Sequence, residues 1–174
     1  MNKVIITIGF IMGLVFSGMA QVQDSRGYIV KVGDMAPDFE MNLTDGSKLK
    51  LSDLKGKVVM LQFTASWCGV CRKEMPFIEK EIWQKHKEKD FALYALDLDE
   101  PQEKAEKLIA ATGITYPVAL DEGAVIFTKY AHKESGVTRN VIVNKEGKII
   151  YLTRLFNQEE FEGMKVVIEN ELKK

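Results

Sequence analysis

Residues 58–71 read VVMLQFTASWCGVC and contain both cysteines of the 174-residue chain. The run over 58–63 is apolar except for Gln62, and this pattern predicts a central strand buried on both faces. Beyond Cys71, apolar residues recur at helical spacing up to about His86, so an amphipathic helix is expected there. Pro76 lies inside that helix and is expected to kink it. The cysteine pair therefore lies where a buried strand ends and a helix begins.

Cys68 and Cys71 are separated by two residues, Gly69 and Val70. At this spacing on a helix, the Cβ atoms of the two cysteines lie about 5–6 Å apart, which a disulfide can bridge with small adjustments. The free N–H groups at a helix N-terminus favour a thiolate on the first cysteine and lower its pKa. We therefore expect Cys68 to be an exposed nucleophile and Cys71 to be the shielded thiol that resolves a mixed disulfide.

Other uses of two cysteines are possible. A zinc site needs two more ligands, and neither His86 nor His132 has ligand spacing to the pair. A purely structural disulfide that closes so short a loop would stabilise the fold only slightly, and an inactive pair is the third alternative. We expect redox chemistry without a metal or a cofactor. His86 ends a lysine-rich helix and is expected to be exposed.

Residues 1–20 differ in composition from the rest of the chain. They begin with Lys3, continue with an apolar run over 4–16 and end with small residues at Ala20. This pattern predicts a secretory signal peptide that is cleaved after Ala20, and the alternative is an uncleaved N-terminal anchor. The apolar run is short for a membrane span, which needs about 20 residues. Residues 21–31 are expected to form a linker and 32–174 one domain, located in an oxidising compartment.

The rest of the chain alternates between strand and helix patterns. Further elements are expected over 39–51 (a hairpin), 91–98 (a strand), 101–112 (a helix), 116–120 (a short edge strand), 123–130 (a short helix), 141–152 (a hairpin) and 161–172 (a helix). This order predicts an α/β fold in which helices flank both faces of a mixed central sheet. The formal net charge is −1 with both signs intermixed, which argues against a nucleic-acid partner. Asp97, Asp99 and Glu100 are expected in a solvated loop.

Three stretches of the sequence resemble a known family. They are GDMAPDF at 33–39, LSDLKGKVV at 51–59 and FTASWCGVCRKEMP at 63–76. They are similar to TlpA/ResA-type thioredoxin-like thiol–disulfide oxidoreductases, a redoxin/AhpC-TSA-like group of extracytoplasmic bacterial proteins, over residues 32–174. The resemblance implies a thioredoxin fold with an N-terminal β-hairpin extension and with Cys68 and Cys71 as the catalytic pair. It also implies that Trp67 flanks the site entrance and that Pro76 bends the active-site helix.

Two positions next to the cysteines depart from the family pattern. Gln62 occupies the place where thioredoxin has a buried acid, and a glutamine cannot accept a proton at neutral pH. Either Glu74, water or a partner group would then help to deprotonate Cys71, or this step would be slower. A solvated helix face is the favoured interpretation of Glu74. Val70 replaces the proline of most relatives, so the Gly69-Val70 dipeptide is expected to alter the reduction potential.

Thr138 occupies the place of the cis-proline that faces the cysteines in the thioredoxin fold. A cis bond before threonine would cost about 2.5–4 kcal/mol, so we predict a trans peptide between Val137 and Thr138. The loop is still expected to face the disulfide and to pair its backbone with a bound substrate strand. Arg139 is expected to add a charge near the site.

The resemblance implies a monomer that reduces or exchanges disulfides of exported proteins, in the periplasm, and is kept reduced by a membrane thiol–disulfide electron donor. A thiol peroxidase of the peroxiredoxin type is one alternative. That chemistry needs proline seven residues before and threonine or serine three residues before its cysteine, where this chain has Leu61 and Ala65. A non-catalytic thiol-binding or chaperone-like module is another alternative.

Overall fold

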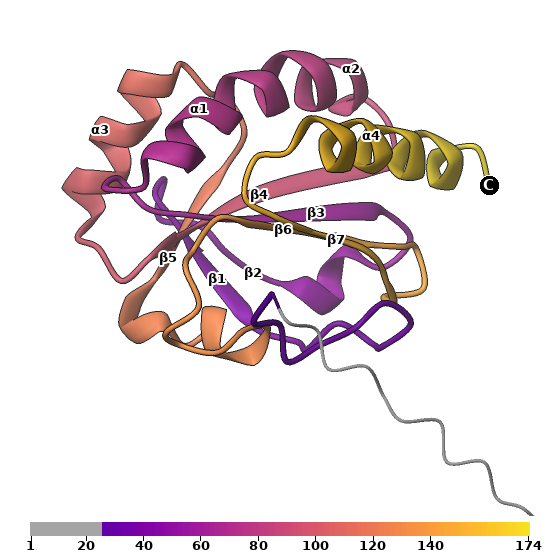
Figure 1. The fold of residues 1–174 in the computed structure, drawn as a ribbon, viewed down its shortest axis with the longest axis horizontal. Helices are drawn as coiled ribbons and strands as arrows, with labels where there is room; N and C mark the ends of the chain where they lie inside the picture. Colours follow the sequence, from indigo (N-terminus) through magenta and orange to yellow (C-terminus); the bar gives the residue numbers. More distant parts are fainter. Residues whose placement is uncertain (1–25) are drawn as a thin grey trace, which may run out of the picture.

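A seven-stranded mixed sheet forms the centre of the protein (Figure 1), for which the computed structural model describes residues 26–174. The strands are β1 (Glu40–Leu43), β2 (Lys48–Lys50), β3 (Val58–Thr64), β4 (Phe91–Leu98), β5 (Val118–Asp121), β6 (Arg139–Val143) and β7 (Ile149–Arg154). Their order in the sheet is β2-β1-β5-β4-β3-β6-β7. Strands β3, β4 and β5 run parallel, and the remaining pairs are antiparallel. The expected signal peptide at 1–20 and residues 21–25 of the expected linker lie outside the described residues.

Within residues 26–174, four α-helices accompany the sheet, and the first of them begins at the cysteine pair. They are α1 (Gly69–Ile78), α2 (Gln84–His86), α3 (Gln102–Thr112) and α4 (Gln158–Leu172). The π-helical segment η2 (Glu79–Trp83) joins α1 to α2, so the predicted helix continues to His86 after Pro76. Short 3-10 turns follow Lys50 and Asp121 and precede Tyr130: η1 (Leu51–Leu54), η3 (Glu122–Ala124) and η4 (Phe127–Lys129). Between residues 26 and 174, no helix is long and apolar enough to cross a membrane.

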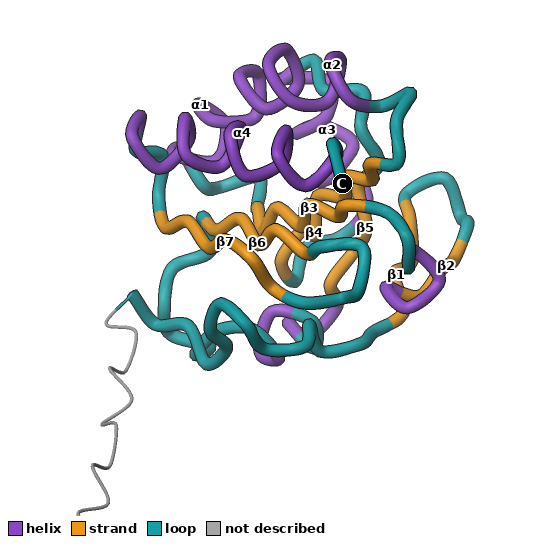
Figure 2. The backbone as a smooth tube through the Cα atoms, turned by 90° about the vertical axis from the view of Figure 1, so that its right-hand side faces the viewer, coloured by secondary structure: helices purple, strands orange, loops and turns teal. Residues whose placement is uncertain are grey.

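The two faces of the sheet are covered unequally. Figure 2 shows the α-helices together on one side, and the opposite side is covered by loops and short helical turns. Side chains such as Met75 of α1 and Met164 of α4 pack with alternate residues of β3 and β4. Helical segments therefore flank both faces, as predicted, but the second face has only 3-10 turns.

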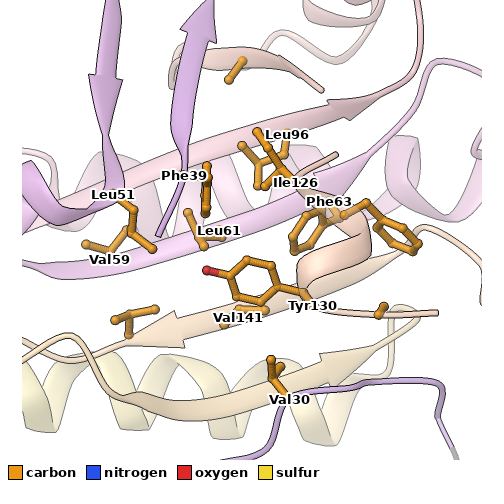
Figure 3. Packing of buried hydrophobic residues seen from close by; sticks show 14 of the residues in the cluster. Val30, Phe39, Leu51, Val59, Leu61, Phe63, Leu96, Ile126, Tyr130 and Val141 are labelled. Carbon is orange, nitrogen blue, oxygen red and sulfur yellow. The ribbon is translucent and has the colours of Figure 1, made fainter. Parts of the chain in front are cut away.

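The loop-covered face contains its own aromatic core, shown in Figure 3. Phe63 of β3 lies edge-on to Phe127, with ring centroids 5.5 Å apart, and also contacts Tyr130. The Tyr130 hydroxyl donates to Pro37 O at 2.9 Å, which fixes the N-terminal segment on this face. Because β3 is fully buried between the two cores, its C-terminal end is a rigid base for the residues that follow.

Two expectations about exposure are wrong. The strand expected at the sheet edge, β5, lies inside the sheet, because the β1–β2 hairpin pairs with it through Asn42 and Leu120. His86 is buried at 5% exposure and packs against Phe91, with ring centroids 5.8 Å apart. The first error arises from pairing between distant segments, which local patterns do not reveal.

Candidate active site

Cys68 and Cys71 form a disulfide at the start of α1, with their Cα atoms 5.3 Å apart. Cys68 is the residue that caps this helix, and its Sγ accepts the Cys71 N–H at 3.1 Å. Gly69 and Val70 form the first helical residues between the two sulfurs. The predicted place of the cysteines at a helix N-terminus is confirmed, and the N–H that now contacts sulfur can stabilise a Cys68 thiolate.

The two sulfurs differ in access, though less than expected. Cys68 is only 7% exposed and Cys71 is fully buried. The prediction of an exposed nucleophile is therefore wrong in degree, because most of Cys68 is covered. Trp67 and Val70, which flank it, are 62% and 37% exposed. Of the two cysteines, only Cys68 keeps any exposed surface.

The Thr138 loop covers the disulfide from the side opposite α1. Thr138 Oγ1 lies 3.2 Å from Cys68 Sγ and 3.3 Å from Cys71 Sγ. Residues 26–174 contain no cis peptide bond, so the predicted trans bond between Val137 and Thr138 is confirmed. The Thr138 carbonyl accepts from Leu155 N at 3.2 Å and from Arg154 Nη1 at 3.3 Å, and these bonds hold the loop against the site.

Arg139 follows Thr138 but directs its guanidinium into the loop-covered face. The side chain is fully buried and lies over the Tyr28 ring, 4.4 Å from the centroid. It donates to Arg26 O at 2.7 Å and to Ser135 O at 3.2 Å. These contacts give Arg139 an anchoring role for the N-terminal segment, and its effect on the cysteines stays a prediction.

Glu74, one turn after Cys71, is a buried carboxyl group. It is 2% exposed, and this burial raises the pKa of Glu74 to about 7, although the neighbouring amides of Asn140 and Gln62 oppose the rise. The expectation of a solvated helix face is therefore wrong. Helical geometry contained the signal, because residues three apart share a face and Cys71 was already placed inside.

A row of polar groups lies beneath α1, across three strands and the segment before β5. Asn140 Nδ2 donates to Glu74 Oε1 at 2.8 Å and to Thr153 Oγ1 at 2.9 Å. The Tyr116 hydroxyl donates to Gln62 Oε1 at 2.8 Å, and Gln62 pairs with Asn140 in the register of β3 and β6. Sequence analysis found Gln62 and missed the other three, because their burial depends on long-range pairing.

The acidic cluster at the C-terminal end of β4 supports the loop before the cysteines. Glu100 accepts Ser66 N at 2.5 Å and Ser66 Oγ at 2.6 Å, which fixes the residue two positions before Cys68. Asp97 is fully buried, and burial, followed by the charge of Glu100, raises the pKa of Asp97 to about 7. The expected solvated loop is therefore wrong for Asp97, while Asp99 is exposed.

A buried parallel strand that leads into a Cys-x-x-Cys helix, with a loop facing the two sulfurs, defines the class of thioredoxin-like thiol–disulfide oxidoreductases, and this chain is one of them. The Redoxin family model matches residues 31–168, so the chain belongs to the Redoxin family. The fold predicted from the sequence is thereby confirmed.

Two relatives are named thiol-disulfide oxidoreductase ResA. The protein from Bacillus anthracis is 36% identical over 121 residues, which cover 70% of this chain and 68% of that protein. The protein from Bacillus cereus (strain ATCC 10987 / NRS 248) is 34% identical over 142 residues, covering 79% and 80%. The chain is therefore similar to ResA proteins over most of their length.

Two solved structures are also similar. A Bacteroides thetaiotaomicron protein assigned as a protein disulfide isomerase has a TM-score of 0.83 and 61% identity, and the match covers 85% of this chain and 94% of that one. A Chlorobium tepidum protein assigned as the thiol:disulfide interchange protein DsbE has a TM-score of 0.73 and 31% identity, with 82% and 99% covered.

Proposed function

We propose that the protein reduces or exchanges disulfide bonds of exported proteins in the periplasm through a Cys68/Cys71 dithiol–disulfide cycle. The observation that carries the proposal is the unequal access of the two sulfurs. Cys68 retains a small exposed area at a helix N-terminus, whereas Cys71 is fully buried one turn further on. This arrangement supports attack by Cys68 and resolution by Cys71.

The cycle balances two electrons and two protons. The Cys68 thiolate attacks one sulfur of the substrate disulfide, and the other substrate sulfur leaves as a thiolate and takes a proton. Cys71 then loses its proton and attacks Cys68 Sγ. The second substrate sulfur leaves and is protonated, and the Cys68–Cys71 disulfide seen in the structure is formed. A dithiol donor returns the pair to its reduced state by the same two steps in reverse.

Glu74 is the group that we assign to accept the Cys71 proton. It lies on the buried side of α1, three residues after Cys71, and its pKa of about 7 suits a general base at neutral pH. Gln62 has no basic atom for this task. Trp67, Val70 and Thr138 border the sulfurs and would contact the partner, while Gly69 and Pro76 shape the helix.

The pattern of residues 1–20 supports export, and the oxidising compartment that follows requires a source of electrons. We assign this source to a membrane thiol–disulfide electron donor. We further propose that the protein acts as a monomer.

Trapping of the mixed disulfide tests the cycle. Cys71→Ser should accumulate a covalent adduct with an oxidised peptide, because the resolving thiol is absent, whereas Cys68→Ser should form none. The reduction potential of the pair should lie on the reducing side, below about −200 mV. Adduct formation through Cys71 in the Cys68→Ser variant, or a potential near that of a strong oxidant, about −120 mV, would contradict the proposal. Rapid turnover of hydrogen peroxide would favour the peroxidase alternative.

A further inference from the structure

The helix that begins at the cysteine pair changes to the π-helical turn η2 at Glu79. Such turns are rare, and they frequently occur at functional sites. Both ends of η2 hold Thr115, in the segment before β5. Glu79 accepts Thr115 N and Thr115 Oγ1, each at 2.8 Å, and Trp83 Nε1 donates to Thr115 Oγ1 at 3.0 Å. The π-helical turn therefore fixes the residue that precedes Tyr116.

Tyr116 extends from this fixed segment into the space beneath α1. Its side chain is buried and lies edge-on to Trp83, with ring centroids 6.4 Å apart. Its hydroxyl donates to Gln62 Oε1 at 2.8 Å. Burial, followed by the charges of Glu74 and Glu79, raises the pKa of Tyr116 well above its usual value. The hydroxyl therefore keeps its proton and is a permanent donor to the Gln62 carbonyl.

This bond decides which end of the Gln62 amide is available to Glu74. A glutamine amide has an acceptor oxygen at one end and an NH2 donor at the other. Gln62 Nε2 and Glu74 Oε2 are both buried without a hydrogen-bond partner within residues 26–174. The Gln62 amide nevertheless lowers the pKa of Glu74, as a donor near a carboxylate does. An amide turned the other way would present its oxygen and favour the protonated carboxyl.

No cation is among the described groups that shift the pKa of Glu74 or Tyr116. The charged groups that act on this pair from other elements are the carboxyls of Glu160 in α4 and Glu79 in η2. Glu160 adds to the rise that burial causes in the pKa of Glu74, and the amides of Asn140 and Gln62 oppose it. In the described part of the chain, the ionised form of Glu74 is thus favoured by two amide groups and by no charge.

The two amides are held by different neighbours. Asn140 Nδ2 is shared between Glu74 and Thr153 Oγ1, so strand β7 fixes its orientation. Gln62 is held by the Tyr116 hydroxyl. Loss of that hydroxyl would leave Asn140 in place and would release Gln62.

We propose that Tyr116 is a positioning residue for the resolution step. Its hydroxyl holds the Gln62 amide with the NH2 group available to Glu74, which keeps that carboxyl able to accept the Cys71 proton. The proposal rests on the proposed function, in which Glu74 is the acceptor. It also gives η2 a role, because this turn clamps the segment from which the Tyr116 hydroxyl reaches Gln62.

Tyr116→Phe tests the proposal, because it removes the hydroxyl and keeps the ring. Carbon-13 NMR of the Glu74 carboxyl carbon, during a pH titration of the oxidised protein, measures the midpoint of its ionisation. Glu74→Gln identifies the resonance. The midpoint should move to higher pH in Tyr116→Phe. The rate at which a Cys68 mixed disulfide resolves at pH 7 should fall about 3–10-fold, because less of Glu74 is ionised.

Tyr130→Phe is the matched control. It also removes a buried tyrosine hydroxyl, which donates to Pro37 O at 2.9 Å on the opposite face of the sheet. This variant should lower the melting temperature by a similar amount. It should leave the Glu74 midpoint unchanged and the resolution rate within about twofold, because distant sites act independently.

Gln62→Met provides a second route, because it removes the amide itself. It should raise the Glu74 midpoint and slow resolution, and it decides the proposal if Tyr116→Phe does not fold. Adding Tyr116→Phe to Gln62→Met should move the midpoint no further, since the hydroxyl acts through the amide.

An unchanged Glu74 midpoint in Tyr116→Phe, or an equal shift in Tyr130→Phe, would overturn the proposal. A raised midpoint with an unchanged resolution rate would also overturn the role of Tyr116 in resolution. Failure of Cys71→Ser to trap a mixed disulfide is a different result, because it contradicts the proposed cycle itself. The NMR titration uses no substrate and is independent of that outcome.

Discussion

Asn140 Nδ2 donates to Glu74 Oε1 at 2.8 Å, beneath the helix that carries both cysteines. The bond connects strand β6 to α1 in a place where water does not reach, and Glu74 Oε2 has no partner there among the described residues. A carboxylate that makes one hydrogen bond in a buried site is only partly compensated for the loss of water. This accounts for the rise of the Glu74 pKa above its usual range.

Glu74→Gln should stabilise the oxidised protein at high pH. The folded-state pKa of Glu74 is raised from 4.5 to about 7, so the unfolded chain loses this proton first as the pH rises. The free energy of unfolding of the natural protein therefore falls between pH 4.5 and 7, by up to about 3 kcal/mol. Urea unfolding at several pH values should show that the free energy of unfolding of the variant exceeds that of the natural protein by an amount that grows across this pH window. Glu88→Gln, at an exposed position, should show none.

The same Glu74→Gln variant should slow the resolution step. It removes the group that we assign to accept the Cys71 proton, and general bases contribute about 10²–10⁴-fold in favourable cases. The measured quantity is the rate at which a Cys68 mixed disulfide converts to the Cys68–Cys71 disulfide near pH 7. A stable variant with an unchanged resolution rate would remove Glu74 from the mechanism.

Thr138→Val should weaken the nucleophile. The Thr138 hydroxyl lies 3.2 Å from Cys68 Sγ and can donate to a thiolate, while valine keeps the volume and loses the donor. One hydrogen bond to a charged group contributes about 1.5–3 kcal/mol, so its loss should raise the pKa of the Cys68 thiol. Thiolate absorbance during a pH titration of the reduced protein measures this pKa. Thr128→Val, whose hydroxyl donates to Ala124 O, provides the matched control.

Glu100→Gln should loosen the loop before Cys68. Ser66 N donates to one carboxylate oxygen and Ser66 Oγ to the other, and the NH2 group that replaces one oxygen in glutamine cannot accept a hydrogen bond. We expect a loss of about 1–2 kcal/mol in the free energy of unfolding, since the contact is partly buried. Ser66→Ala should lower the free energy of unfolding by a smaller amount than Glu100→Gln. The double variant should lower it by less than the sum of the two single losses. Additive losses would show that the two residues act independently.

Asp97→Asn should stabilise the protein above pH 7 and have little effect near pH 4. Burial raises the pKa of Asp97 from 3.8 to about 7, and the neighbouring Glu100 charge adds to the rise. The folded protein holds this proton where the unfolded chain has lost it, so its stability falls as the pH rises through this window. Thermal unfolding at pH 4 and pH 8 would measure the change, and equal shifts at both values would contradict it.

Local sequence patterns predicted the parts of the site that lie close together in the chain. The apolar run before Trp67 and the spacing of Cys68 and Cys71 were sufficient to place a strand, a helix N-terminus and the redox pair. The family resemblance supplied Thr138, because its distance from the cysteines in sequence is large. These predictions succeeded because each depends on one segment or on one known motif.

The residues that sequence analysis misjudged are polar groups buried by distant segments. Glu74 meets Asn140 across 66 positions of sequence, and Ser66 meets Glu100 across 34. Asp97 was assigned to solvent because acidic residues are rarely buried. Strand pairing and helix packing decide such burial. Helical spacing from Cys71 indicates it for Glu74, whereas no periodic pattern indicates it for Asp97 or for the Ser66–Glu100 contact.

Cys68 caps α1 through the same sulfur atom that reacts, and this links the chemistry to the backbone. The Cys71 N–H donates to Cys68 Sγ in the disulfide. After reduction the same N–H would donate to a Cys68 thiolate, which carries a full negative charge and accepts a stronger hydrogen bond. Hydrogen exchange of the Cys71 amide should therefore be slower in the reduced protein than in the oxidised one. The exchange rate of the Cys71 amide hydrogen, in the first turn of α1, therefore reports whether the cysteine pair is oxidised or reduced, without a dye or a label.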